Sequence, residues 1–258
     1  MPGPDLDLLI AAAWAAGDTV RPFFRNAARA WEKDGGAGPV TEADLAVNAV
    51  LERILREARP DYGWLSEESP PDDRRAHARR SFVIDPIDGT RAFIEGQDSF
   101  SHALCVVEDG QPIAAVVYLP IRDRLYAAQA GGPATRDGQP IAVSARAGVA
   151  GAQILTTKAS LSAEHWRGDA PAFERVFRPS IAWRLCLVAE GRFDGILSFR
   201  PTWDWDIAAG SLIAAQAGAR VTDARGQPLR FNGPAAQNDG IWAAPPALHG
   251  ALRDRMAL

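Results

Sequence analysis

The N-terminal part of the chain carries apolar side chains at the spacing of amphipathic helices. Over residues 6–30, apolar positions such as Leu9, Ala13 and Val20 recur at roughly helical intervals, which predicts a long helix that ends before the loop KDGGAGP. Thr41 followed by Asp44 is typical of a helix N-terminus, and an apolar stripe then continues to residue 60. We expect two helices that pair with each other.

Beyond these helices the pattern changes to short apolar segments separated by turns. Strands are predicted over residues 62–65 and 81–84, and the second leads directly into the motif DPIDGT. From residue 100 to residue 143, the segments HALCVVE, IAAVVYL, RLYAAQ and PIAV are separated by turn signals such as Asp109-Gly110 and Asp137-Gly138. This succession predicts an antiparallel meander.

From about residue 144 onward, strands and helices alternate. Strands are predicted at ILTT (154–157) and FDGILSF (193–199), and helices over 180–190, 206–218 and 246–255. We place a boundary near residue 145, between an N-terminal α+β lobe (1–145) and a C-terminal α/β lobe (146–258). Because no low-complexity linker separates the lobes, we expect them to pack together.

Composition and charge argue against several classes of protein. The chain has 258 residues, is 47% hydrophobic and has a net charge of −4 without a basic tract, so no extended surface for nucleic acid or anionic lipid is expected. The pattern of a signal peptide is missing, and no apolar run reaches the length of a membrane span. Cys105 and Cys186 lie in apolar runs, where reduced thiols are expected, and this suits a cytoplasmic protein.

Acidic residues stand at the ends of predicted buried elements, where charge is costly. Glu67 and Glu68 follow one apolar segment, Asp85 and Asp88 follow a second, and Asp206 begins an apolar helix. Carboxylates that converge in a pocket of low dielectric constant repel one another unless cations neutralise them. Because the pattern has no His or Cys pair with metal-ligand spacing, Mg²⁺ is the cation that these oxygen ligands favour.

Each of these acids also has an ordinary structural explanation. SEESPPDD could be a solvated acidic loop, Asp44 could act only as a helix cap, and Asp206 could simply favour the first turn of its helix. DPIDGT is harder to explain in this way, because a turn does not need two carboxylates, a proline and a Gly-Thr pair. If Gly89 and Thr90 begin a helix, their amides form an anion site that suits phosphate. Together the motifs indicate metal-assisted phosphoryl transfer.

The ordered motifs VTEAD (40–44), SEES (66–69), DPIDGT (85–90) and WDIAAG (205–210) resemble those of the inositol monophosphatase family. These are Mg²⁺-dependent, lithium-sensitive phosphatases that share a fold with fructose-1,6-bisphosphatase. LVAEGRFD, GGPATRDGQPI and AGARVTDARGQPL extend the resemblance over nearly the whole chain. The resemblance implies a layered α-β-α-β-α sandwich, a homodimer, and a phosphomonoesterase that hydrolyses a small phosphorylated metabolite by direct attack of water.

The resemblance also implies the metal ligands. It places a first Mg²⁺ on Glu67, Asp85 and the backbone carbonyl of Ile87, and a second on Asp85, Asp88 and Asp206. A weaker third ion would lie near Glu67. About two to three ions per site are therefore expected, as in other metal-assisted phosphoryl transfer.

Catalytic and phosphate-binding roles follow from the same resemblance. Glu67 and Thr90 would orient and deprotonate the attacking water, with Asp44 behind Thr90 and Glu68 as a supporting acid. The hydrolysed phosphate would be contacted by Asp88, Gly89 and Thr90.

The resemblance leaves several phosphate esters open as substrates. Enzymes that act on inositol phosphate often carry a carboxylate shortly before the WD motif, whereas this chain has Arg200 there. Arg200, Arg184 or Lys158 could engage a second phosphate, as the similar 3'(2'),5'-bisphosphate nucleotidases require, or could serve only in salt bridges. The segment DPIDGTRAFI is also similar to histidinol-phosphate phosphatases. A catalytically silent binding or regulatory protein is a further alternative.

Overall fold

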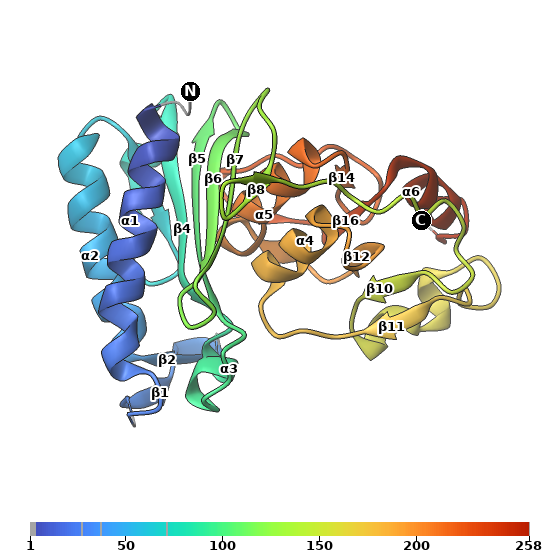
Figure 1. The fold of residues 1–258 in the computed structure, drawn as a ribbon, viewed down its shortest axis with the longest axis horizontal. Helices are drawn as coiled ribbons and strands as arrows, with labels where there is room; N and C mark the ends of the chain where they lie inside the picture. Colours follow the sequence, from blue (N-terminus) through green and yellow to red (C-terminus); the bar gives the residue numbers. More distant parts are fainter. Residues whose placement is uncertain (1–3, 27, 37, 71, 258) are drawn as a thin grey trace.

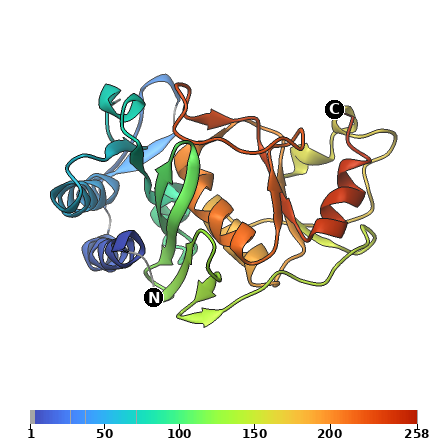
Figure 2. The ribbon, with the colours of Figure 1, turned by 90° about the horizontal axis from the view of Figure 1, so that it is seen from above.

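The computed structural model describes residues 4–26, 28–36, 38–70 and 72–257, which fold into alternating layers of helices and sheets (Figure 1). Two main sheets lie on either side of a central pair of helices, and further helices cover their outer faces, as the view from above also shows (Figure 2). The layer order is therefore α-β-α-β-α, which confirms the expected fold class.

The outer layer beside the first sheet is formed by α1 (Pro4–Val20) and α2 (Glu42–Ala58). Their apolar faces share one buried cluster with the sheet, to which Leu9 contributes from α1 and Leu51 from α2. Both side chains are fully buried. Burial of this apolar surface fixes the two helices against the sheet, because removing apolar surface from water is the main favourable term in folding.

The ends of these helices follow local sequence signals. Thr41 and Asp44 cap α2 reciprocally, side chain to backbone, as the sequence predicts. The prediction that the first helix continues to residue 30 is wrong, because α1 ends at Val20 and a 3₁₀ turn (Arg21–Phe23) follows. Pro22 explains the difference, since proline disfavours the α conformation of the residue before it and lacks an N–H.

The first sheet has seven strands in the order β3-β4-β5-β6-β7-β8-β9. Their bounds are Gly63–Ser66, Arg80–Asp88, Ser101–Glu108, Gln111–Leu119, Arg124–Gln129, Thr135–Arg136 and Gln139–Pro140. β3 and β4 run parallel, and the later strands pair antiparallel with their neighbours, which confirms the meander. The strand predicted at PIAV is wrong beyond Pro140, because the Val143 N–H leaves the sheet and donates to the Ala217 carbonyl at 3.1 Å.

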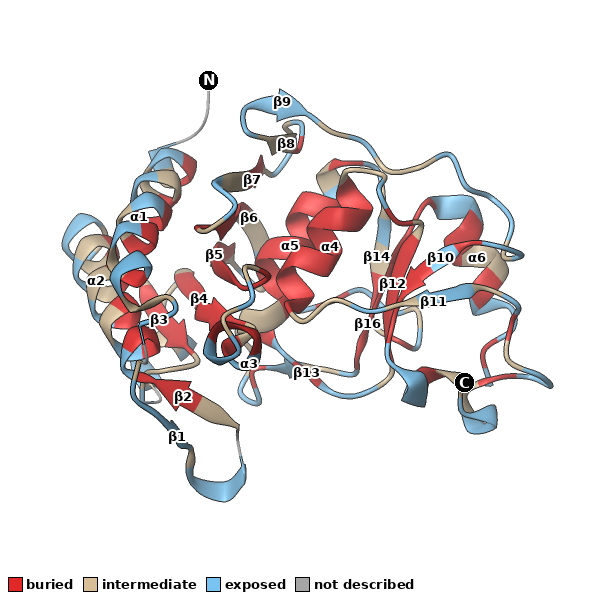
Figure 3. Ribbon diagram, turned by 60° about the horizontal axis from the view of Figure 1, so that its bottom comes forward, coloured by how far each residue is buried: buried red, intermediate tan, exposed pale blue. Residues whose placement is uncertain are grey.

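The central layer consists of α4 (Ile181–Ala189) and α5 (Asp204–Gln216), which are buried between the two sheets (Figure 3). The helices approach each other closely, since a Cβ at Gly210 would lie 2.7 Å from Leu185 Cβ. This layer matters for function because the first turn of each helix reaches the end of β4.

The second sheet has the strand order β11-β10-β12-β16-β14. Their bounds are Glu174–Val176, Gln153–Leu155, Gly195–Ser198, Ile241–Ala244 and Arg220–Thr222. The helix α6 (Pro246–Arg253) covers the outer face, where Leu248 and Leu252 pack against Trp242 of β16. The strands near residues 154 and 196 and the three helices predicted for this half of the chain are confirmed, with shifts of a few residues at their ends.

Smaller elements complete the fold. They are α3 (Thr90–Ile94), the hairpin of β1 (Ala30–Glu32) and β2 (Pro39–Thr41), the pair β13 (Thr202–Trp203) and β15 (Gln237–Asn238), and 3₁₀ turns at Asp34–Gly36, Asp73–Ala76, Lys158–Leu161 and Ala163–His165. The division into lobes at residue 145 stays a prediction. Within the described residues, every helix is too short or too polar to cross a membrane.

Candidate active site

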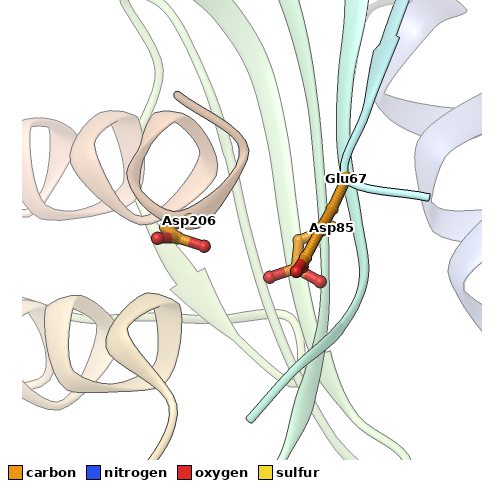
Figure 4. Close-up of side chains that lie close together, drawn as sticks. All are labelled: Glu67, Asp85 and Asp206. Atoms are coloured by element: carbon orange, nitrogen blue, oxygen red, sulfur yellow. The ribbon is translucent and has the colours of Figure 1, made fainter. Parts of the chain in front are cut away.

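Three carboxylates from different elements converge at the end of the first sheet (Figure 4). Glu67 directly follows β3, Asp85 lies in β4, and Asp206 lies in the first turn of α5. Each contributes an oxygen atom that lies within 4.8 Å of the other two. The Glu67 N–H donates to the Ile84 carbonyl at 3.2 Å, which holds Glu67 beside Asp85 on the neighbouring strand.

Burial and the charges of neighbouring acids raise the pKa values of Asp85 and Asp206. Asp85 is only 1% exposed, and its pKa is raised well above the ordinary range by burial first and then by the charges of Glu67, Asp88 and Asp206. The pKa of Asp206 is raised well above the ordinary range by burial and then by the charges of Asp88 and Glu67. Hard carboxylate oxygens that repel one another in a buried position fit a divalent cation, because its charge would neutralise them.

Asp88 lies at the end of β4, and its carboxylate is anchored to the start of α4. Ser180, the N-cap of α4, donates from Oγ to Asp88 Oδ2 at 2.6 Å, and the Ala182 N–H donates to the same oxygen at 2.7 Å. Burial raises the pKa of Asp88 to about 6, although these two hydrogen bonds oppose the increase. Both bonds end on Oδ2, so that Oδ1 is the oxygen that can face a cation.

A buried threonine and aspartate lie next to the carboxylates. Thr90 Oγ1 is 3.3 Å from Asp44 Oδ1 and 3.1 Å from the carbonyl oxygen of Ile87. The other oxygen of Asp44 accepts hydrogen bonds from the N–H and the hydroxyl of Thr41. Burial raises the pKa of Asp44 to about 6 in spite of these bonds. Asp44 is therefore both the cap of α2 and the partner of Thr90.

Gly89 makes the turn that joins β4 to α3. Its φ of 104° lies in the left-handed region, which glycine adopts without the steric cost that other residues meet. This conformation places Gly89 and Thr90 side by side in the wall of a cleft of about 1200 Å³, which opens over Glu67, Asp85 and Asp206.

Lys33 is a contact of this cluster that the sequence did not predict. Its Nζ lies 2.8 Å from Glu67 Oε1 and 2.6 Å from Glu68 Oε1. Burial raises the pKa of Glu68 to about 7, while the ammonium group of Lys33 lowers it. The sequence could not show this pairing, because Lys33 and Glu67 are 34 residues apart and lie in loops without a shared pattern.

The predicted substrate residues separate into two groups. Arg184 and Arg200 line the cleft together with several other arginines, among them Arg178. Lys158 instead is exposed at the start of its 3₁₀ turn and does not belong to the described lining, although its neighbour Thr157 does. The structure therefore brings two of the three predicted cations to the cleft.

Comparison with known proteins agrees with this geometry. The profile of the inositol monophosphatase family matches residues 4–256. The 3'(2'),5'-bisphosphate nucleotidase CysQ of Escherichia coli is 35% identical over 205 residues, which cover 75% of this chain and 79% of that protein. The inositol-1-monophosphatase of Rhizobium meliloti is 31% identical over 252 residues, 93% of each protein.

Solved structures show the same similarity along the whole chain. The IMPase of Thermotoga maritima superposes with a TM-score of 0.85 at 25% identity, covering 98% of this chain and 96% of its own. The extragenic suppressor protein SuhB of Bartonella henselae superposes with a TM-score of 0.82 at 26% identity, covering 98% of each chain. With its converging carboxylates, its layered fold and its matching family profile, the chain belongs to the inositol monophosphatase family of metal-dependent phosphatases.

Proposed function

We propose that the protein is a Mg²⁺-dependent phosphomonoesterase that hydrolyses a small phosphorylated metabolite by direct attack of water. The observation that carries this proposal is the convergence of Glu67, Asp85 and Asp206 below a cleft large enough for a metabolite. The relatives support it, because the nucleotidase and the inositol-1-monophosphatase are both hydrolases of phosphate monoesters.

The carboxylate cluster would hold the cations. Glu67, Asp85 and the carbonyl of Ile87 would bind one ion, Asp85, Asp88 and Asp206 a second, and Glu67 a weaker third. Bound Mg²⁺ supplies neutralisation of the carboxylates, polarisation of the phosphoryl group and a lower pKa for water. Asp85 is buried and is repelled by its acidic neighbours when the cations are absent, so it gains most from their positive charge.

Thr90 and Asp44 would prepare the attacking water. In this proposal the water donates a hydrogen bond to Thr90 Oγ1, whose own proton is directed at Asp44 Oδ1, 3.3 Å away. Asp44 has a pKa of about 6, so it is ionised near neutral pH and can attract that proton. Glu67 would hold the water from the other side, and Glu68 would support Glu67 through their shared contact with Lys33.

The hydrolysed phosphate would lie over the cluster, next to Asp88 and the backbone of Gly89 and Thr90. Gly89 and Thr90 belong to the wall of the cleft, so the phosphate can approach the backbone there. Backbone N–H groups would then stabilise, by hydrogen bonding, the negative charge on the leaving oxygen and the phosphoryl oxygens.

A second candidate function is the hydrolysis of a 3'(2'),5'-bisphosphate. The identity of 35% to a bisphosphate nucleotidase and the arginines of the cleft favour it over an inositol phosphate. For either substrate, inhibition by lithium, a homodimer and a location in the cytoplasm stay predictions.

The proposal is tested by measuring phosphate release from inositol 1-phosphate, adenosine 3',5'-bisphosphate, histidinol phosphate and fructose 1,6-bisphosphate with and without Mg²⁺. Asp88→Asn should abolish Mg²⁺-dependent release from every substrate that the wild type hydrolyses. The matched control is Asp98→Asn, because Asp98 lines the same cleft but pairs with Arg122 at 2.7 Å. Turnover that survives in Asp88→Asn would contradict the proposal.

A further inference from the structure

His102 is a buried histidine opposite the end of β4, and the described lining of the cleft does not include it. It lies in β5, and its side chain is fully buried. The rings of Phe100 and Tyr118 each lie 6.3 Å from the imidazole, and Nε2 has no hydrogen-bond partner among the described residues. An apolar side chain would fill this position at lower cost, because a buried nitrogen loses its hydrogen bond to water. Packing alone therefore does not explain a histidine here.

A bulge in β4 creates a contact that does explain it. The register between β4 and β5 shifts between Asp85 and Asp88, where Pro86 and Ile87 lie opposite His102 alone. Such a bulge leaves an extra residue outside the regular ladder of hydrogen bonds. Here the side chain of His102 reaches the bulge, and its Nδ1 lies 2.5 Å from the Pro86 carbonyl oxygen.

The chemistry of the two groups fixes the direction of this hydrogen bond. A carbonyl oxygen only accepts, so Nδ1 of His102 carries the proton and donates. Burial lowers the pKa of His102 to about 4, so the ring is neutral near pH 7 and has a single N–H. The Pro86 carbonyl receives that N–H, and Nε2 is left as an acceptor without a partner among the described residues.

The peptide group between Pro86 and Ile87 is held from both ends. His102 binds its oxygen, and its N–H donates to Asp85 Oδ1 at 3.0 Å. Because a peptide group is planar, fixing the carbonyl also fixes the direction of the N–H. A hydrogen bond to the oxygen also polarises the peptide and strengthens the N–H as a donor. The orientation of the Asp85 carboxylate therefore depends on His102 through the backbone.

We infer that His102 is a positioning residue that orients the Asp85 carboxylate for cation binding through the Pro86–Ile87 peptide. This inference rests on the proposed function, in which Asp85 binds two ions and the Ile87 carbonyl binds one of them. Groups that orient a metal ligand by hydrogen bonding contribute a factor of about 10 to 100 to metal affinity. His102 therefore raises the cation affinity of the site without contacting the cation or the substrate.

The test compares two replacements of His102 by calorimetry with Mg²⁺ alone. His102→Leu fills a similar volume without a donor, whereas His102→Asn can place its amide nitrogen near the position of Nδ1. The leucine variant should bind Mg²⁺ about 10- to 100-fold more weakly than the wild type, and the asparagine variant should recover most of the affinity. The Mg²⁺ concentration for half-maximal phosphate release should rise by the same factor in the leucine variant.

His249→Leu is the matched control. His249 is also fully buried, with one ring nitrogen bonded and the other without a partner among the described residues. It lies in α6, on the outer side of the second sheet and away from β4 (Figure 1). Its replacement should change stability and leave Mg²⁺ affinity at the level of the wild type, so that a general effect of losing a buried histidine is separated from the role of His102.

NMR of ¹⁵N-labelled histidine side chains tests the hydrogen bond itself. Near pH 7 the wild type should show a neutral imidazole that is protonated on Nδ1, and this signal should be missing from His102→Asn. A His102 ring protonated on Nε2 could not donate to the Pro86 carbonyl and would overturn the inference.

The binding data can also overturn it, either by wild-type Mg²⁺ affinity in His102→Leu or by an asparagine variant that binds no better than the leucine variant. If circular dichroism shows that His102→Leu does not fold, His102→Gln replaces it, because its amide lies one bond further from the backbone. Equal Mg²⁺ affinities of the asparagine and glutamine variants would then contradict the inference.

The same measurements separate the inference from the proposed function. A wild type that binds Mg²⁺ but hydrolyses no ester would contradict the proposed function, while the affinities of the His102 variants would still decide the role of His102. A wild type that binds no Mg²⁺ would contradict both.

Discussion

The hydroxyl of Thr90 lies 3.3 Å from Asp44 Oδ1, although the two residues are 46 positions apart in the chain. The contact joins the first turn of α2 to the first residue of α3 at the edge of the carboxylate cluster. Both side chains are buried, so water does not compete strongly for the bond. We propose that Thr90 and Asp44 are the pair that accepts a proton from the attacking water.

Replacing Thr90 by valine removes the hydroxyl while keeping the shape of the side chain. We expect kcat to fall by about 10²- to 10⁴-fold, the range typical of general base catalysis, with little change in KM. Thr90→Ser keeps the hydroxyl and should retain most of the activity. Steady-state kinetics of both variants check this, and a Thr90→Val enzyme as fast as the Thr90→Ser enzyme would show that the hydroxyl takes no part.

Ser180 links α4 to Asp88, so Ser180→Ala should affect both stability and cation binding. Loss of the N-cap and of the donor to Asp88 should lower the free energy of unfolding by about 1–3 kcal/mol. Mg²⁺ affinity should fall by about 10- to 100-fold, as for other residues that orient a metal ligand. Denaturant unfolding and calorimetry with Mg²⁺ measure the two effects.

Ser211→Ala is the matched control for this change. Ser211 is also buried in the central layer, but its hydroxyl has no hydrogen-bond partner among the described residues. Its removal should leave stability equal or slightly higher and should not change Mg²⁺ affinity. If Ser180→Ala and Ser211→Ala have the same stability and the same Mg²⁺ affinity, the bond from Ser180 to Asp88 does not have the proposed role.

Features that depend on neighbouring residues were predictable from the sequence, whereas contacts between distant segments were not. The cap of Thr41 and Asp44 and the turn at Gly89 depend on residues a few positions apart, so a local pattern was enough to predict them. The bond from Ser180 to Asp88 spans 92 positions and exists only because the start of α4 lies at the end of β4. Such pairings are set by the packing of layers, which leaves no local pattern in the sequence.

The same distinction explains where the structure departs from the pattern of the sequence. Helical spacing continued past Val20 in the sequence, but the backbone restriction around Pro22 ended the helix there. Lys158 is one residue away from the cleft lining and faces solvent, a difference of direction that charge and position alone do not show. Family motifs located the carboxylates, whereas the direction of isolated cations required the structure.

His249 makes stability depend on pH in a direction that can be tested. His249 lies in α6 and its ring is buried, Nε2 contacts Thr222 Oγ1 at 3.0 Å, and burial lowers the pKa of the ring from 6.5 to about 4. The unfolded chain therefore binds the proton more readily than the folded protein between these pH values. The contribution of neutral His249 to the free energy of unfolding is complete above pH 6.5 and is lost as the pH falls towards 4.

The His249→Gln variant separates the pH dependence caused by His249 from that caused by the buried carboxylates, because the carboxylates titrate alike in the wild type and the variant. The difference in unfolding free energy between wild type and variant should change by about 3 kcal/mol from pH 7 to pH 4, to the disadvantage of the wild type. Denaturant unfolding at several pH values measures it. A constant difference across this range would mean that His249 is not held neutral by burial.

We propose that Asp85 belongs to a cluster of acids that binds cations. Asp85→Asn preserves the shape of the side chain and an oxygen for the Ile87 N–H, which Asp85 Oδ1 accepts at 3.0 Å. Because the ionised form of Asp85 is disfavoured by burial and by its acidic neighbours, the neutral amide should raise Tm when Mg²⁺ is absent. The same substitution removes a shared ligand and should lower hydrolysis by at least about 10³-fold.

The most direct measurement is the Tm of wild type and Asp85→Asn in EDTA and in Mg²⁺, with phosphate release measured on the same samples. Our account predicts that Mg²⁺ raises the Tm of the wild type alone, that the variant is the more stable protein in EDTA, and that only the wild type hydrolyses its ester. A variant that is less stable in EDTA, or that keeps both the Mg²⁺-dependent rise in Tm and the activity, would contradict it.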